Sequence, residues 1–195
     1  MTEKVLNKPM YADEIVKIFR SGLPKDELIE KISDYHTSDI ADALEKMTAD
    51  ERKALYPVLG VELVAEIFSY IEDSEEYLKE INSDKVANLL SEMDSDDAVD
   101  ILEKLGDDDR KRIVALLDND AKQDVRMILS YDDDEIGSYM TTNYICIPGG
   151  LTVKQAMSQL VRQAGENDNI MTIYVVDSDE CFAGAIDLKD LITAR

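Results

Sequence analysis

The chain has 195 residues, with 21 Lys and Arg against 43 Asp and Glu, which gives a formal charge of −22. This charge argues against nucleic-acid binding, because a protein that neutralises phosphates needs a basic face. With 45% hydrophobic residues the chain is too apolar for a disordered acidic tail. No window reaches the roughly 18 apolar residues of a membrane span. We therefore expect a folded, soluble chain that stays in the cytoplasm without entering a membrane.

Two short helices are predicted at the start of the chain. The runs YADEIVKIFRSGL and PKDELIEKI carry apolar residues at helical spacing, and Gly22 and Pro24 separate them. Residues 1–24 are expected to form a leader helix, and the second helix opens the next domain.

A twelve-residue repeat follows, from residue 36 to residue 129, and only the stretch EDSEEYLKEI from residue 72 breaks it. The eighth position of each block is apolar, and the twelfth is Met, Leu or Ile. Because these positions lie four residues apart, they share one face of a helix. The blocks are HTSDIADALEKM, TADERKALYPVL, GVELVAEIFSYI, NSDKVANLLSEM, DSDDAVDILEKL, GDDDRKRIVALL and DNDAKQDVRMIL.

Each block also has the composition of a helix start. An acid occupies the third position of most blocks, where it meets the positive end of the helix dipole. Such a short helix is unstable alone, because nucleation is costly and neighbours must cover its apolar stripe. We therefore predict a right-handed-type superhelix of short α-helices, an acidic domain over 25–130. The second position of the blocks supplies the expected helix caps, Thr37, Ser83, Ser95, Asp107 and Asn119.

The pattern changes after a junction at 131–140. TNYICIPGG, MTIYVVD and CFAGAI predict strands, whereas LTVKQAMSQLVRQAG and DLKDLITAR predict helices. The order over 141–195 is β-α-β-β-α, so the fold class is multi-domain, α followed by α/β. Helices cover only one side of so small a sheet, and we expect the unit to pair with a second copy, in the same chain or in a partner.

The run IYVVDSDECFAGAIDLKDLI resembles a cystathionine-β-synthase (CBS) motif. With the repeats and the junction YDDDEIGSYMTTNYICIPGGLTV, residues 25–195 resemble the cytosolic part of the MgtE family of magnesium transporters. The resemblance implies a cytoplasmic-face module of a multi-pass membrane protein, a pore domain of the same parent protein as partner, and a homodimer through CBS motifs. The sequence ends after the first of two expected CBS motifs, so we expect a truncated piece of such a protein or a stand-alone relative.

Acidic residues are concentrated between 94 and 109, where eight acids stand against one base. Mg²⁺ prefers hard oxygen ligands, usually one or two carboxylates with retained waters. Asp96 and Asp100 share a helix face, where like charges cost roughly 0.2–0.5 kcal/mol unless they are neutralised. Two interpretations stay open: this pair binds Mg²⁺ or another divalent cation, or the acids only favour helix starts and solvation. Similarly spaced acids occur at Asp120 and Asp124.

The family resemblance favours the metal site. In MgtE relatives the two acids of the matching DDxxD stretch, here Asp96 and Asp100, join a main-chain oxygen of a junction glycine, here Gly137, to hold magnesium between the domains. The alternative for Gly137 is a backbone turn where a helix ends. The acids from Asp132 to Glu135 are a second candidate, for which a solvated charge run at a helix start is the better explanation.

A nucleotide site is the other possibility that the resemblance raises. CBS motifs often bind adenine nucleotides, with a Ser or Thr on the phosphate and an Asp on the ribose. In the run GAIDLKD, Asp190 keeps the ribose position while Asp187 replaces the hydroxyl. A carboxylate repels a phosphate, which disfavours nucleotide binding here, and Asp190 is alternatively a surface helix residue.

The leading hypothesis is a Mg²⁺-sensing regulatory module. Ions bound between the acidic superhelix and the CBS region would favour a compact state, which in the family closes the pore. The alternative is a metal-indifferent α-solenoid scaffold that presents its concave face to a protein partner. An enzyme is disfavoured, because no Gly-rich phosphate loop, activated nucleophile or His-centred constellation accompanies the acids.

Overall fold

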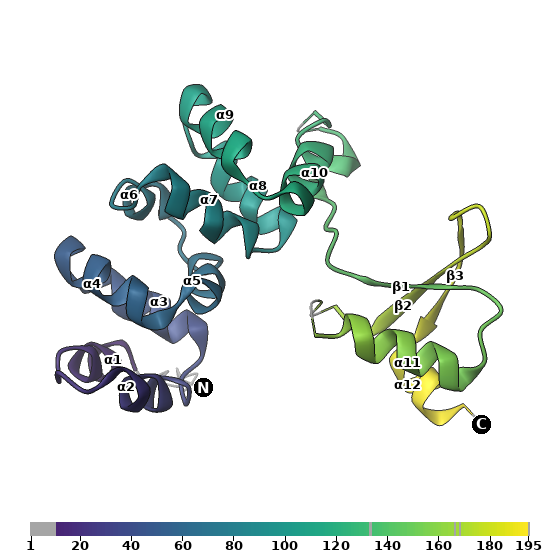
Figure 1. The fold of residues 1–195 in the computed structure, drawn as a ribbon, viewed down its shortest axis with the longest axis horizontal. Helices are drawn as coiled ribbons and strands as arrows, with labels where there is room; N and C mark the ends of the chain where they lie inside the picture. Colours follow the sequence, from purple (N-terminus) through teal and green to yellow (C-terminus); the bar gives the residue numbers. More distant parts are fainter. Residues whose placement is uncertain (1–10, 133, 166, 168, 195) are drawn as a thin grey trace, which may run out of the picture. The chain divides into compact units, whose positions relative to one another are not determined.

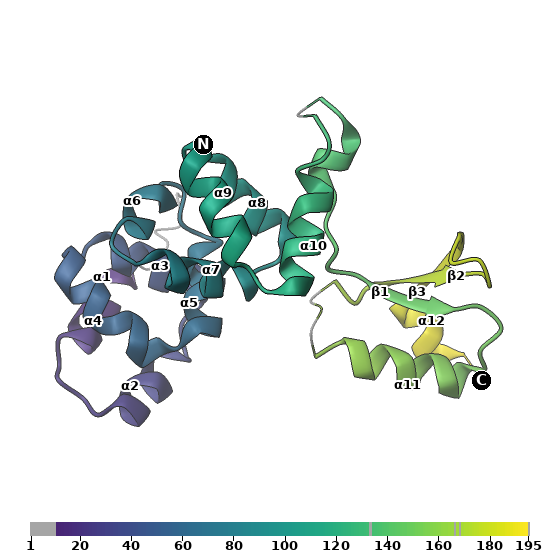
Figure 2. The same cartoon turned by 45° about the horizontal axis from the view of Figure 1, so that its top comes forward.

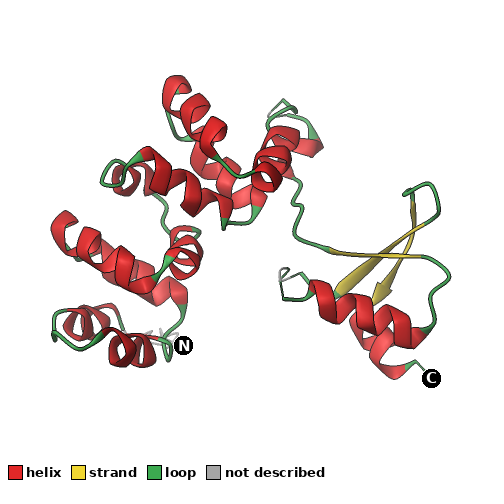
Figure 3. Ribbon diagram, in the orientation of Figure 1, coloured by secondary structure: helices red, strands yellow, loops and turns green. Residues whose placement is uncertain are grey.

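The computed structural model describes residues 11–132, 134–165, 167 and 169–194. The chain divides into two compact units, Met1–Ser138 and Tyr139–Arg195, which are described separately. The first unit is helical and the second is built on a small mixed sheet (Figure 1, Figure 3). This is the fold class that the sequence predicts. Among the described residues, no helix combines the length and apolarity that crossing a membrane requires.

The first unit is a stack of short helices in which the main contacts join helices two places apart, whereas α2 packs on α1 and α4 packs on α5. Contacts join α1 with α3, α3 with α5, α5 with α7, α7 with α9, and α8 with α10 (Figure 2). Of the leader predicted over 1–24, residues 1–10 lie outside the described residues. The helices are α1 (Ala12–Phe19), α2 (Lys25–Ile32), α3 (Thr37–Glu45), α4 (Ala49–Leu59), α5 (Val61–Phe68), α6 (Ser74–Leu78), α7 (Ser83–Ser91), α8 (Ser95–Glu103), α9 (Asp107–Leu116) and α10 (Asn119–Ile128), and the 3₁₀ turn η1 (Ile136–Tyr139) follows.

The apolar positions of the repeat form the core of this stack. The twelfth positions are buried or half-buried, and Leu59 and Leu117 are among the most enclosed. A short helix therefore gains its stability from the neighbours that cover its apolar face. The eighth positions are all buried: Ala43, Leu55, Ile67, Leu89, Ile101, Ile113 and Val125.

The helix caps lie one residue earlier than the sequence predicted. The side chains of His36, Thr48, Asn82 and Asp118, at the first position of their blocks, accept hydrogen bonds from main-chain N–H groups of the first helical turn. The predicted cap Thr37 is the first residue of α3, and it is buried. Polar residues fill the first three positions of most blocks, so composition alone does not identify which of them has the extended backbone of a cap.

Arg52 fastens the segment that interrupts the repeat. Its guanidinium donates to the Glu80 carboxylate and to the main-chain carbonyls of Leu44 and Met47, and it lies 4.4 Å from the centre of the Tyr77 ring. Glu80 and Tyr77 belong to the stretch EDSEEYLKEI. The Arg52 and Glu80 side chains are each only 12% exposed. The irregular segment is therefore held against α4 by one nearly buried ion pair.

The second unit has the predicted order β-α-β-β-α. The strand order is β1-β2-β3; β1 runs parallel to β2, with Ile145 opposite Ile173, and β2 runs antiparallel to β3. The Cys146 N–H donates a hydrogen bond to the side-chain oxygen of Gln163, and the Gln163 side-chain amide donates one to the Cys146 carbonyl. These two bonds join α11 to the edge strand β1. The elements are β1 (Ile145–Pro148), α11 (Val153–Gln163), β2 (Thr172–Val176), β3 (Phe182–Asp187) and α12 (Leu188–Thr193).

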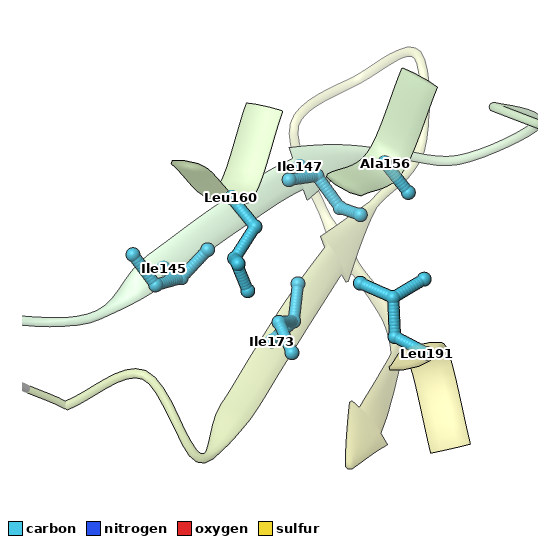
Figure 4. Close-up of a cluster of buried hydrophobic side chains, with 6 residues drawn as sticks. All are labelled: Ile145, Ile147, Ala156, Leu160, Ile173 and Leu191. Atoms are coloured by element: carbon cyan, nitrogen blue, oxygen red, sulfur yellow. The ribbon is translucent and has the colours of Figure 1, made fainter. Parts of the chain in front are cut away.

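One face of this sheet carries the core of the second unit. Side chains from β1 and β2 meet those of α11 and α12 in a single cluster (Figure 4). The opposite face has no helix among the described residues of this unit. This agrees with the expectation that helices cover only one side. The buried members of the cluster are Ile145, Ile147, Ala156, Leu160, Ile173 and Leu191.

The ion pair of Arg52 makes a stability prediction. Arg52→Met should lower the free energy of unfolding by about 3–5 kcal/mol, because it leaves the Glu80 carboxylate enclosed without its partner. The double variant Arg52→Met/Glu80→Leu should lose less than the single variant. Urea unfolding followed by far-UV circular dichroism measures both. Arg20→Met is the control, since its pair with Glu51 is more exposed to solvent, which weakens the contribution of an ion pair to stability. Equal losses for Arg52→Met and Arg20→Met would contradict the assignment.

Candidate functional site

The first turns of α8 carry the candidate metal ligands. Asp96 is half-buried and Asp100 is exposed, one helical turn further along. Burial raises the pKa of the neighbouring Asp97 carboxyl, and a hydrogen bond with Ser69 opposes this shift. The negative charges of Asp96, Asp94 and Asp100 raise the same pKa further. The carboxylates are thus close enough to repel one another, and a hard divalent cation would relieve that repulsion.

Gly137 lies in the η1 turn, and its neighbours explain why it is a glycine. A Cβ atom added there would come within 2.5 Å of the Tyr131 ring, so any larger residue must displace the ring. Two hydrogen bonds close the preceding loop: the Asp132 N–H donates to the Glu135 carboxylate at 2.9 Å, and the Glu135 N–H donates to the Asp132 carbonyl at 2.8 Å. The Ser138 N–H then donates to the Glu135 carbonyl at 3.1 Å. Gly137 thus lies inside η1 and not at the end of α10, and the nearby Tyr131 ring gives a structural reason for a glycine there.

The second candidate, the acids from Asp132 to Glu135, is explained in part by the same loop. The Glu135 carboxylate is engaged with the backbone, and Asp133 lies outside the described residues. Asp134 is exposed, as expected for a solvated charge run.

The predicted ligands belong to two elements of the first unit. The helix α8 that carries Asp96 and Asp100 packs on α10, and the chain passes from the end of α10 into η1 with Gly137. Among the described residues, no group of three or more His, Cys, Asp or Glu side chains is placed to hold a metal ion. The predicted site, with two carboxylates and one main-chain oxygen, has fewer ligand side chains than such a group. It stays a prediction.

The candidate nucleotide residues sit at the start of α12. The Asp187 carboxylate accepts a hydrogen bond from the Lys189 N–H at 2.8 Å and caps the helix. Asp190 is exposed in the first turn of the same helix. Asp187 therefore has a structural role as a helix cap, which a Ser or Thr hydroxyl could also fill.

Sequence reasoning predicted an open sheet face but did not identify its chemistry. The rings of Tyr144 and Tyr174 meet edge to face at 5.5 Å, and Phe182 lies 6.3 Å from Tyr174. They line a hollow of about 670 Å³. Phe182 and Met171 are 69% and 64% exposed. Outward positions that alternate along β2, such as Thr172 and Tyr174, are the sequence pattern that could have located this face.

A superhelix of short acidic helices followed by one βαββα unit defines a class of two-part, helical plus α/β, proteins. The sequence matches the family model "MgtE intracellular N domain" over residues 35–134 and the "CBS domain" model over residues 136–195. The chain belongs to the MgtE family.

Relatives of known name agree with this assignment. The chain is 45% identical over 146 residues to "Magnesium transporter MgtE" of Enterococcus faecalis, covering 73% of this chain and 32% of that protein. It is 37% identical over 71 residues to "Magnesium transporter MgtE" of Thermus thermophilus, covering 36% of this chain and 16% of that protein. The chain thus spans no more than about a third of the length of either relative.

Two solved structures share the fold across nearly the whole chain. "Crystal structure of the soluble part of a magnesium transporter" matches with a TM-score of 0.87 and 29% identity, covering 94% of this chain and 75% of that one. "Crystal structure of the cytosolic domain of the Mg2+ channel MgtE in complex with ATP" matches with a TM-score of 0.79 and 28% identity, covering 94% and 76%.

The contact between Gly137 and Tyr131 makes a second prediction. Gly137→Ala should lower the free energy of unfolding by about 1–3 kcal/mol, because the new methyl group overlaps the ring. Thermal or urea unfolding measures the change. In a Tyr131→Ala background, where the ring is absent, adding Gly137→Ala should lower the free energy of unfolding much less than it does in the parent. The double variant Tyr131→Ala/Gly137→Ala is therefore compared with Tyr131→Ala. Gly106→Ala is the control, since nothing lies within 4 Å of a Cβ there. If the double variant recovers nothing, the steric explanation fails.

Proposed function

We propose that this chain is the Mg²⁺-sensing regulatory part of a magnesium transporter, on the cytoplasmic face of the membrane, and that it controls a pore domain of the same parent protein. The observation that carries the proposal is the crowding of carboxylates in the first turns of α8, where Asp94, Asp96 and Asp100 all act on Asp97. Membership of the MgtE family supports the choice of ion.

The proposed mechanism is a linkage between ion binding and conformation. Asp96 and Asp100 supply carboxylate oxygens and Gly137 supplies a main-chain oxygen, a donor set of the hard type that Mg²⁺ prefers. Without a cation these groups repel one another and their acidic surroundings, within a chain of charge −22. Binding then favours the more compact state by as much as the ion prefers that state. In the parent protein this preference would close the pore.

A nucleotide is not part of this proposal. The matched structure with ATP is that of a relative. In this chain the Asp187 carboxylate stands at the start of α12 and would repel a phosphate there.

A magnesium titration tests the sensor proposal. We expect the radius of gyration, measured by small-angle X-ray scattering at constant ionic strength, to fall saturably with Mg²⁺. Asp96→Asn/Asp100→Asn should abolish the saturable response. Constant ionic strength is needed because any salt screens so acidic a chain.

The matched control for this titration is Asp120→Asn/Asp124→Asn, which removes a pair of acids with the same spacing from α10. It should keep the response of the parent. If all three proteins contract alike, the effect is diffuse screening and the site assignment is wrong. If none contracts, the metal-indifferent scaffold is the better account.

We further propose that the open face of the second unit pairs with the same face of a second copy of this chain, so that two CBS motifs cover each other. The support is the exposed aromatic surface of Tyr144, Tyr174 and Phe182, which a soluble protein rarely leaves uncovered over a wide area.

Sedimentation equilibrium tests this pairing. The parent chain should form a dimer, and Tyr174→Glu/Phe182→Glu should be monomeric, because a buried carboxylate without a partner is costly. Val161→Glu is the control. The Val161 side chain is 66% exposed, about as much as that of Phe182, but it lies on α11 and not on the open sheet face. A dimer that survives Tyr174→Glu/Phe182→Glu and dissociates with Val161→Glu would place the interface elsewhere.

A further inference from the structure

Asp100 has a charged neighbour on each side along α8. Asp96 lies four residues before it and Lys104 lies four residues after it, at the C-cap of the helix. Side chains at this spacing are neighbours on a helix surface, with about 5–6 Å between their Cβ atoms. An acid that precedes a lysine by four residues is also the favourable order for an ion pair. Asp100 therefore has one neighbour that repels it and one whose charge is complementary to it.

In the structure, Lys104 is bonded elsewhere. Its Nζ donates a hydrogen bond at 3.0 Å to the main-chain carbonyl of Glu72, in the segment that interrupts the repeat. Within the described part of the chain, Lys104 and Asp100 form no ion pair. Lys104 is also the one base among the eight acids between residues 94 and 109. The lysine that best fits Asp100 in the sequence thus leaves that carboxylate to other cations.

The bond between Lys104 and Glu72 can exchange for one with Asp100. Both Lys104 and Glu72 are exposed, so water competes for their hydrogen bond. The ammonium group of a lysine is carried on a flexible four-carbon stem. It can therefore leave the Glu72 carbonyl and reach back by one helical turn. Lys104 has two arrangements, one on Glu72 and one on Asp100.

We propose that Lys104 sets the Mg²⁺ affinity of the site on α8 by competing with the ion for Asp100. This inference rests on the sensor proposal and adds a residue that regulates it. When Lys104 pairs with Asp100, it offsets the repulsion between Asp96 and Asp100, and an incoming ion must displace it. When Lys104 bonds to Glu72, both carboxylates can bind the ion. The apparent affinity is reduced by the fraction of molecules in the first arrangement.

The sign of the effect separates competition from structural support. A lysine that only fastened α8 to the segment around Glu72 would support the site, and its removal would weaken Mg²⁺ binding or leave it unchanged. The removal of a competitor has the opposite effect, because the carboxylates are then occupied by the ion alone. Tighter binding after removal of Lys104 is therefore specific to the competition.

A magnesium titration of the full chain tests this inference. The amide shifts of Ser95–Glu103 are followed in ¹H–¹⁵N NMR spectra at constant ionic strength. In Lys104→Met the Mg²⁺ concentration at half-saturation should fall by about twofold to fivefold, because a competing pair is lost and a positive charge beside a divalent ion is removed. Lys104→Arg keeps the positive charge and should bind Mg²⁺ no more tightly than the parent.

The matched control is Lys31→Met, the same charge change at an exposed lysine of α2, a helix that packs on α1. It should keep the half-saturation of the parent, and circular dichroism should show all variants folded. Unchanged or weaker binding in Lys104→Met overturns the inference while the sensor proposal stands. Equal tightening in Lys104→Met and Lys31→Met also overturns it, because net charge would then explain the effect. If the parent shows no saturable shift that Asp96→Asn/Asp100→Asn abolishes, the sensor proposal fails and this inference fails with it.

Discussion

The structure of the first unit depends on the inability of a short helix to bury its own apolar face. Each block has one turn of cap and acid followed by several apolar positions, and only a neighbouring helix can cover these. The burial of Ile67, Leu90 and Leu102 shows how completely the stack does so. Because the core uses so few positions, the remaining ones are free to be acidic, and the chain reaches a charge of −22 without losing its fold.

The interruption of the repeat concentrates the specific interactions of this unit. In regular blocks the apolar period alone specifies the packing, but the segment around the short α6 cannot use it. There the fold relies on Arg52, whose guanidinium joins a carboxylate, two carbonyls and an aromatic ring. Glu80 and Ile81 of the same segment line a groove together with residues of α4, α5 and α7. Where the apolar period stops, polar and aromatic contacts of individual side chains therefore replace it.

Sequence periodicity predicted the stack, the β-α-β-β-α order and the one-sided sheet, because each follows from spacing along the chain. It placed the caps one residue late, since polar residues occupy several adjacent positions at each helix start. It did not identify the Arg52–Glu80 pair, whose members are 28 residues apart, or the contact of Tyr131 with Gly137. Contacts of that kind depend on how the helices stack, which no local pattern specifies.

The two predicted carboxylate ligands, Asp96 and Asp100, differ in how far helix stability alone explains the acid at their position. An acid recurs at the third position of the blocks, as Asp50, Asp84 and Asp120 illustrate, because it meets the helix dipole. Asp96 occupies that position, so helix stability alone explains it, and Asp96→Asn would also cost about 0.3–1 kcal/mol of dipole interaction. Asp100 lies one turn further along, where the dipole has little effect, although three other blocks also carry an acid there, Asp42, Glu66 and Asp124. An ion-specific role is therefore tested more cleanly at Asp100 than at Asp96.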